Sequence, residues 1–189
     1  MTDRRLRVAG WGSAADGTTV TWSVAEGRRG RRYREVLSRD GAVVHALLLE
    51  TTPDRRFAHL ELAREGVLVT AHPEPDGTIH GNTIAADGSG VRHLIGLATG
   101  PEGLVMVDGS VMAAAAIAWQ LRDIVEAGGR ATFEGVSIDS RGHVEIDEAL
   151  SVERLSPTRW RIAHAPAVDV GEDGRPILAD GATLPLELD

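Results

Sequence analysis

Residues 110–129, with the sequence SVMAAAAIAWQLRDIVEAGG, form the only segment of the chain whose apolar residues recur at helical spacing. Ser110 follows an Asp-Gly pair and suits the N-cap position, because its hydroxyl can accept a free amide N–H of the first turn. The alanines that follow have the highest intrinsic helix propensity, and the pair Gly128–Gly129 supplies a stop. The pattern predicts one helix over about residues 110–127.

The apolar face of this helix consists largely of alanine. Such a face lets a helix lie close to a sheet but adds little bulk to fill a wide cavity. Gln120 and Arg122 interrupt the apolar run well short of the ~20 residues that a membrane span requires. We therefore expect a buried core helix and no membrane span.

Short segments of alternating polar and apolar residues, separated by turn signals, make up the rest of the chain. Strands that follow one another through short turns favour antiparallel neighbours, and a long meander curls because strands twist. Strands and helices do not alternate, which excludes doubly wound folds. We predict a mainly β fold of the α+β type: an antiparallel meander curled into a β-roll or half-barrel around one central helix.

The length of 189 residues is typical of one domain with a substantial core. Residues 168–189 are rich in glycine, aspartate and proline and close with a short apolar segment at residues 184–188. We interpret the chain as a single domain, residues 1–189, with residues 168–189 as a C-terminal arm.

Composition excludes several classes of function. The chain has no cysteine, which removes disulfides, thiolate catalysis and thiolate metal sites. Its net charge of −8 argues against a nucleic-acid partner. The first residues are charged and lack an apolar core, so we expect no signal peptide and a soluble, cytoplasmic protein. All 20 basic residues are arginine and Asn82 is the only asparagine, a bias typical of a GC-rich bacterial genome.

Residues 28–34, RRGRRYR, concentrate five arginines around a tyrosine. We interpret this segment as a hairpin whose outward positions carry charge, which also protects a strand edge. The alternative is a contact with an anionic partner.

Three histidines and Asn82 form the most promising polar cluster. If the turn at residues 73–77 centres on Asp76, His72 pairs with His80 across two strands. Asn82 then shares a face with His80 and lies opposite His93 on the next strand. A slip of one residue would send each side chain to the other face.

These side chains suit three roles: metal ligation with an open position for water, general-base catalysis, or the orientation of a ligand in a mostly apolar pocket. Their spacing matches no known ligand signature, so we expect no metal and no cofactor. No catalytic residue can be assigned. The predicted ligand-binding residues are His72, His80, Asn82, His93 and Trp119, the last at the rim of a cavity. The alternative is that the histidines are exposed or satisfied cross-strand pairs without a role.

Gly81 separates His80 from Asn82, and a glycine within a strand marks a bulge or a close approach by another element. We expect the helix to make that approach.

Three hypotheses of function follow. The first is a non-enzymatic protein that binds a small apolar or amphipathic, lipid-like ligand in the cavity of the half-barrel. The second is a small enzyme, similar to a hydrolase or isomerase, that uses His72, His80, Asn82 and His93. The third is an interaction module that dimerises through an exposed edge or face of its sheet, and it gains if the helix fills the sheet completely.

Overall fold

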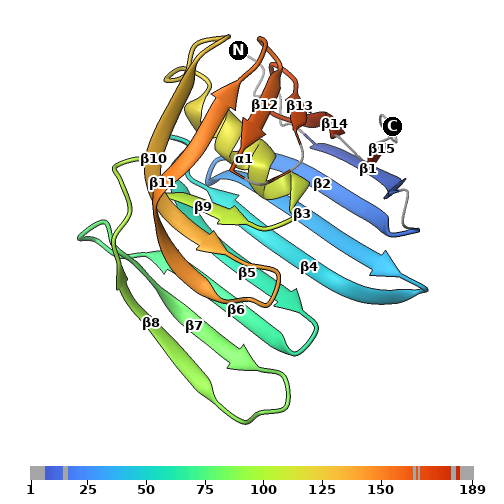
Figure 1. The fold of residues 1–189 in the computed structure, drawn as a ribbon, viewed down its shortest axis with the longest axis vertical. Coiled ribbons are helices and arrows are strands. Elements are labelled where there is room, and N and C mark those ends of the chain that lie inside the picture. Colours follow the sequence, from blue (N-terminus) through green and yellow to red (C-terminus); the bar gives the residue numbers. More distant parts are fainter. Residues whose placement is uncertain (1–6, 15–16, 164, 166, 180–181, 184–189) are drawn as a thin grey trace.

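The computed structural model describes residues 7–14, 17–163, 165, 167–179 and 182–183 (Figure 1). The first eight strands are β1 (Arg7–Ala14), β2 (Thr19–Gly27), β3 (Gly30–Arg39), β4 (Ala42–Thr51), β5 (Phe57–Arg64), β6 (Val67–Pro73), β7 (Ile79–Ala85) and β8 (Val91–Leu97). The remaining elements are β9 (Leu104–Val107), α1 (Val111–Leu121), β10 (Arg130–Ile138), β11 (Val144–Arg154), β12 (Arg159–Ile162), β13 (Val168–Val170), β14 (Pro176–Ala179) and β15 (Ala182–Thr183).

The described strands form one hydrogen-bonded sheet in the order β8-β7-β6-β5-β4-β3-β2-β1-β15-β14-β13-β12-β11-β10-β9. Strands β1 to β8 are an antiparallel meander, and the remaining strands curl over it so that α1 lies between the two parts (Figure 1). This arrangement confirms the predicted mainly β fold with one helix enclosed by a curled sheet. Pairing of β1 with β15 joins the two parts.

One pair departs from the antiparallel prediction. Strands β9 and β10 are parallel, and α1 connects them. A crossover of this kind needs a connection of a dozen or more residues, which the helix supplies. The pattern of a strand does not reveal in which direction it runs or with which strand it pairs after a helix. The sequence analysis therefore did not predict this parallel pair.

Helix α1 begins as predicted. The Ser110 Oγ accepts a hydrogen bond from the Ala113 amide at 3.0 Å. Residues 112–118 are all buried, and α1 packs against β3, β4, β9, β12, β13 and β14. The small side chains let strands approach the helix from both sides.

The helix ends at Leu121 rather than near residue 127. The amides of Ile124 and Val125 both donate to the Leu121 carbonyl in a closing turn. Arg154 of β11 donates to the carbonyls of Arg122 and Val125 at 2.8 and 2.9 Å, so a side chain from another strand caps the helix. This contact across the fold has no local signature in the sequence.

Two-residue alternation divides β1 to β8 into an inner face, where α1 packs on β3 and β4, and an outer face. On β4, for example, Leu47 and Leu49 are buried while Leu48 on the outer face is half-buried. The inner positions form the core together with the helix and the second part of the sheet.

Gly81 lies opposite Ala71 of β6, and a Cβ atom there would lie 1.9 Å from the Thr70 carbonyl oxygen. The close approach comes from the neighbouring strand and not, as predicted, from the helix. The pairing of β7 with β8 also shifts register between Ile79 and Gly81, which marks a bulge.

The C-terminal residues add strands β13, β14 and β15 to the sheet. The apolar segment expected at residues 184–188 lies outside the described residues. Within the described part of the chain, no helix has the length and apolar character needed to cross a membrane.

Replacement of Gly81 by alanine is expected to destabilise the fold by about 2 kcal/mol or more, because its Cβ would collide with the backbone of β6. Urea unfolding measures the change. The matched control is Gly90→Ala, whose Cβ meets nothing within 4 Å. Equal stability of the two variants would contradict the close approach.

Candidate functional site

The histidine cluster forms with the predicted register. His72 lies opposite His80, and Asn82 lies opposite His93. The His93 Nδ1 and Asn82 Oδ1 atoms are 2.8 Å apart, within hydrogen-bond distance. A Glu74 oxygen lies 3.2 Å from His72 Nε2 and 3.8 Å from His80 Nδ1. The sequence therefore identified which side chains meet.

These side chains belong to the outer face. The side chain of His72 is 50% exposed and that of His80 is 32% exposed, whereas the intervening Ala71, Gly81 and Leu94 are buried. Among the described residues, no group of three or more histidine, aspartate or glutamate side chains could hold a metal ion. The predicted ligand-binding role of the cluster stays a prediction.

Trp119 is not part of that cluster. It lies on α1, where the guanidinium carbons of Arg31, Arg55 and Arg122 lie 3.9, 4.6 and 4.8 Å from its ring centroid. Trp119 also lines a cavity of about 160 Å³ together with Trp160. Stacked guanidinium groups are attracted by the indole ring and hold it in place, and a ligand role for Trp119 stays a prediction.

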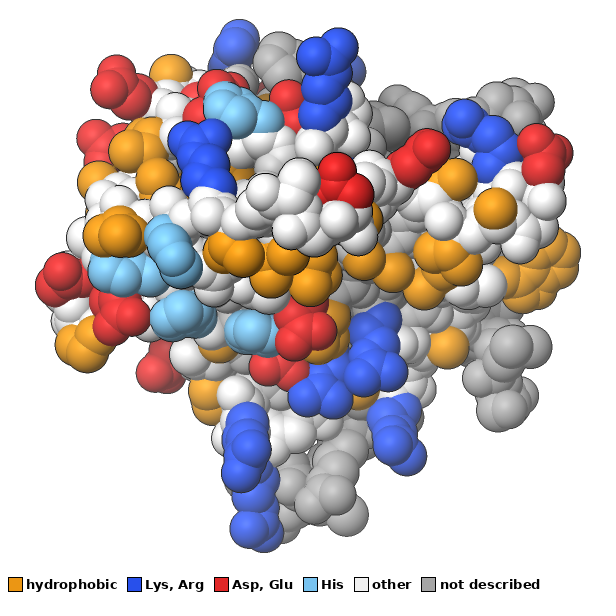
Figure 2. Space-filling view, turned by 90° about the horizontal axis from the view of Figure 1, so that it is seen from below, with side chains coloured by type: hydrophobic (Ala, Val, Ile, Leu, Met, Phe, Trp, Pro, Cys, Tyr) orange, Lys and Arg blue, Asp and Glu red, His pale blue; other side chains and the backbone are white. Residues whose placement is uncertain are grey.

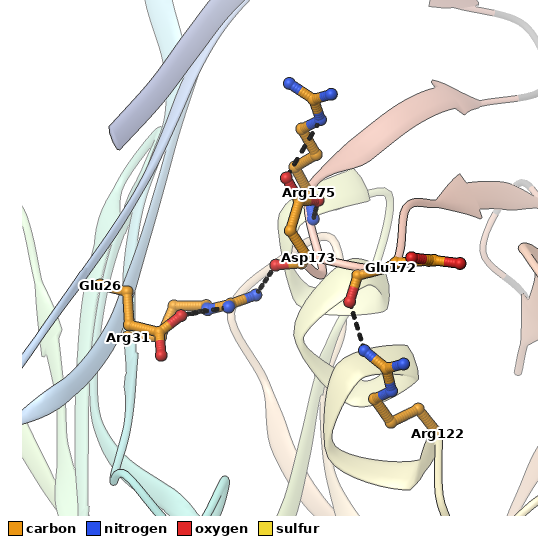
Figure 3. A network of polar contacts seen from close by, with 6 residues as sticks. All are labelled: Glu26, Arg31, Arg122, Glu172, Asp173 and Arg175. Carbon is orange, nitrogen blue, oxygen red and sulfur yellow. Dashed lines mark hydrogen bonds and ion pairs between the residues drawn. The ribbon is translucent and has the colours of Figure 1, made fainter. Parts of the chain in front are cut away.

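Arg31 connects this tryptophan to the turn between β13 and β14 (Figure 3). The Arg31 side chain is 4% exposed, and its guanidinium pairs with Glu26 and donates to the Asp173 carbonyl. Arg122 donates to the neighbouring Glu172 carbonyl. Two arginines, from β3 and from the end of α1, therefore hold the turn above the helix. The arginine segment forms the predicted hairpin with Arg32 and Arg34 exposed, whereas the buried role of Arg31 was not predicted.

A buried polar group at the start of α1 was not predicted. Glu35 of β3 is 0% exposed, and its Oε2 accepts a hydrogen bond from the Met112 amide at 2.9 Å. Its Oε1 lies 3.2 Å from His45 Nε2 of β4, off the hydrogen-bond direction. Arg64 of β5 donates to His45 Nδ1 at 3.2 Å. One helix and three strands meet at these side chains.

The direction of the Arg64 bond fixes the form of the imidazole. Because the guanidinium donates, His45 Nδ1 must accept, and a neutral imidazole then carries its proton on Nε2, facing Glu35. Arg64 also donates to the Asp139 carbonyl at 2.8 Å, and burial lowers the pKa of its guanidinium.

A glutamate next to a histidine is a common acid–base pair in active sites, but Glu35 and His45 are both buried in the core. Their geometry suits an anchor: a carboxylate that accepts from the first turn of a helix is stabilised by the helix dipole. The signal that could have revealed them is alternation, because Glu35 shares the inward phase of Tyr33 and His45 that of Leu47.

Tyr33 lies beside this group on β3 and is 0% exposed. Its hydroxyl has no hydrogen-bond partner among the described residues. Burial raises the pKa of Tyr33 well above its usual value, and the positive charge of Arg31 offsets part of that increase.

On the outer face, one row of cross-strand neighbours is almost entirely apolar. We call it the apolar row. Its members, from β1 to β8, are Trp11, Thr21, Val36, Ala46, Ala63, Leu68, Ile84 and Val91. The side chains at its two ends are exposed, Trp11 at 54% and Val91 at 55%.

Figure 2 shows a band of hydrophobic side chains across the face of the molecule seen from below. Histidines, carboxylates and arginines follow one another along one side of this band. The register gives the same order, because the row next to the apolar row includes Arg34, Leu48, Glu61, Asn82 and His93.

Comparison with protein-family models, with curated proteins and with solved structures finds no significant match to this chain. The function is therefore argued from the arrangement of the side chains.

Truncation of Glu35 to alanine is expected to lower the free energy of unfolding by about 3 kcal/mol, because it removes the acceptor of the buried Met112 amide and leaves His45 Nε2 without its carboxylate. Urea unfolding near pH 7 measures the loss. The control is Glu145→Ala on the exposed side of β11, expected within about 0.5 kcal/mol of the parent. Similar losses in both variants would contradict the anchor.

Tyr33 is the only tyrosine, so tyrosinate absorbance reports on it alone. Its folded-state pKa is raised, so the unfolded chain releases this proton first, from about pH 10 upward. Stability is expected to fall as the pH rises through that range, and tyrosinate to appear only as the chain unfolds. Parallel circular dichroism detects unfolding. Ionisation near pH 10 in a chain that is still folded would contradict the burial of Tyr33.

Proposed function

We propose that this protein is an interaction module that self-associates through the outer face of strands β1 to β8. The observation that carries the proposal is the apolar row, which crosses all eight strands on a face that no described element covers. An antiparallel sheet with one solvated face normally places polar residues outward. A continuous apolar surface is typical of an interface.

The position of α1 supports this choice over the binding of an apolar ligand in the half-barrel. The helix occupies the concave side of the sheet, and residues 112–118 are all buried there. A lipid-like ligand needs the same space. Ligand binding and catalysis by the histidine cluster stay predictions from the sequence.

A two-fold axis parallel to the strands and above β4 is the symmetry that fits this face. Rotation about that axis preserves strand direction and reverses strand order, so β3 of one copy lies over β5 of the other. Each row of cross-strand neighbours then lies over the same row of the second copy. Val36 faces Ala63 of the second copy, and Ala46 and Leu48 approach the axis, as in aligned packing of two sheets about 10 Å apart.

The same rotation brings opposite charges together. Arg34 lies on β3 and Glu61 on β5, on either side of Leu48 in one row. In the dimer, Arg34 of each copy lies over Glu61 of the other, which gives two equivalent pairs. Arg34 has no ion-pair partner among the described residues. The Glu61 side chain is 55% exposed, and its Oε1 lies 3.0 Å from His59 Nε2 of the same strand. Such complementarity fixes register and partner choice.

Sedimentation velocity over a concentration series tests the proposal. The parent chain is expected to form a dimer, and Arg34→Glu and Glu61→Arg are each expected to raise the dimer Kd at least tenfold, since each variant places two pairs of like charges together. The double variant is expected to recover a Kd within about threefold of the parent, because it restores both pairs with exchanged signs.

Ile95→Asp provides the control. Ile95 lies on the edge strand β8 and is 73% exposed, but it is not part of the apolar row. This variant is expected to leave the dimer intact. Loss of the dimer in Ile95→Asp with no change in the charge variants would show pairing through the edge of the sheet and would overturn the proposed face. A parent chain that stays monomeric would overturn it as well.

A further inference from the structure

We infer that a groove beside the β2–β3 hairpin is a binding site for a small anion that carries several phosphate groups. This inference is independent of the proposed self-association. The groove has a volume of about 600 Å³, within the range of roughly 300–1,000 Å³ typical of small-molecule sites. We call it the arginine groove, because the residues that line it include Arg7, Arg28, Arg29, Arg31 and Arg32.

The charge of the arginine groove differs from that of the chain. Its lining holds five arginines and only two carboxylates, Glu26 and Glu50, a difference of +3 in a protein whose net charge is −8. An acidic protein that gathers positive charge in one hollow attracts anions to that place, because low-dielectric walls focus the field.

Both carboxylates are already paired. Glu26 binds the buried Arg31 with an Nε–Oε2 distance of 3.1 Å. Glu50 binds Arg32 with an Nε–Oε1 distance of 2.6 Å. Arg7, Arg28 and Arg29 have no ion-pair partner among the described residues. Three guanidinium groups are thus available to a ligand, and two neutralised pairs complete the lining.

The backbone presents Arg28 and Arg29 at the tip of the hairpin, between the paired residues Gly27 and Gly30. Gly30 has a φ of +111°, and a Cβ there would lie 1.9 Å from the Thr51 carbonyl oxygen. Only glycine therefore lets the hairpin close against the end of β4. The base of the hairpin is held further by Arg31, which binds Glu26 and the Asp173 carbonyl (Figure 3). Its guanidinium also packs on the Trp119 ring.

Phosphate is the chemistry that this lining fits. A guanidinium fork matches the oxygens of a phosphate group with two parallel hydrogen bonds. A single oxyanion satisfies one or two such forks, whereas three available guanidiniums in a groove of this size suit a ligand with two or more phosphates.

Isothermal titration calorimetry with inorganic tripolyphosphate, at about 0.15 M salt to suppress non-specific attraction, tests the inference. One equivalent is expected to bind saturably. The double variant Arg28→Gln/Arg29→Gln is expected to raise the Kd at least tenfold, because two of the three available guanidiniums are lost. Citrate, a tricarboxylate of similar charge, is expected to bind at least tenfold more weakly than tripolyphosphate.

The matched control is Arg92→Gln/Arg141→Gln, which removes the same charge from two exposed positions outside the groove. Its Kd is expected to stay within twofold of the parent. An equal loss of affinity for tripolyphosphate in both double variants would show that binding depends only on the net charge of the protein. That result, the absence of saturable binding, or equal affinity for citrate would overturn the inference.

Discussion

The contact on which the rest of the structure depends is the bond between the Glu35 carboxylate and the first turn of α1. A buried carboxylate is costly unless hydrogen-bond donors surround it. Here the Met112 amide donates to it, and the Nε2 atom of His45 faces it. Through Arg64 the same group reaches the carbonyls of Asp108 and Asp139, near the ends of β9 and β10. The Glu35 carboxylate, together with His45 and Arg64, thus fixes the position of α1 relative to both parts of the sheet.

This contact also sets the register of the outer face. Side chains alternate along a strand, so a slip of one residue would turn Glu35 outward and bring Arg34 or Val36 into the core. The cost of a buried unpaired arginine excludes that slip. Strand β3 pairs with β2 and β4 over most of its length. The inward position of Glu35 therefore also determines which residues of β2 and β4 face inward. The same register therefore turns the residues of the apolar row outward, but it does not require them to be apolar.

Sequence reasoning reached the architecture and the pairing of the histidines because both depend on local signals. The turn at residues 73–77 alone determines that His72 meets His80. The end of α1 was missed because it depends on Arg154, which lies 33 positions after Leu121 (154 − 121) and has no local signature. The Glu35 anchor was not predicted for a related reason: only the fold brings the Met112 amide to its carboxylate. The side of the sheet on which the histidines lie likewise depends on where α1 packs.

The inner and outer faces of the first eight strands are under different physical constraints. Aromatic residues are few, at 4% of the chain, so the core is made mainly of aliphatic side chains and of a helix thin enough to be enclosed. Enclosing it uses inner positions of the sheet, whereas the residues of the apolar row lie outside the core. Polar residues would serve solubility best at those positions, yet the apolar row extends across every strand from Trp11 to Val91. Arg28 and Arg29 lie at the tip of the β2–β3 hairpin, beside a groove that five arginines line. Packing of α1 requires neither feature, and this is the ground on which both surfaces are proposed as binding surfaces.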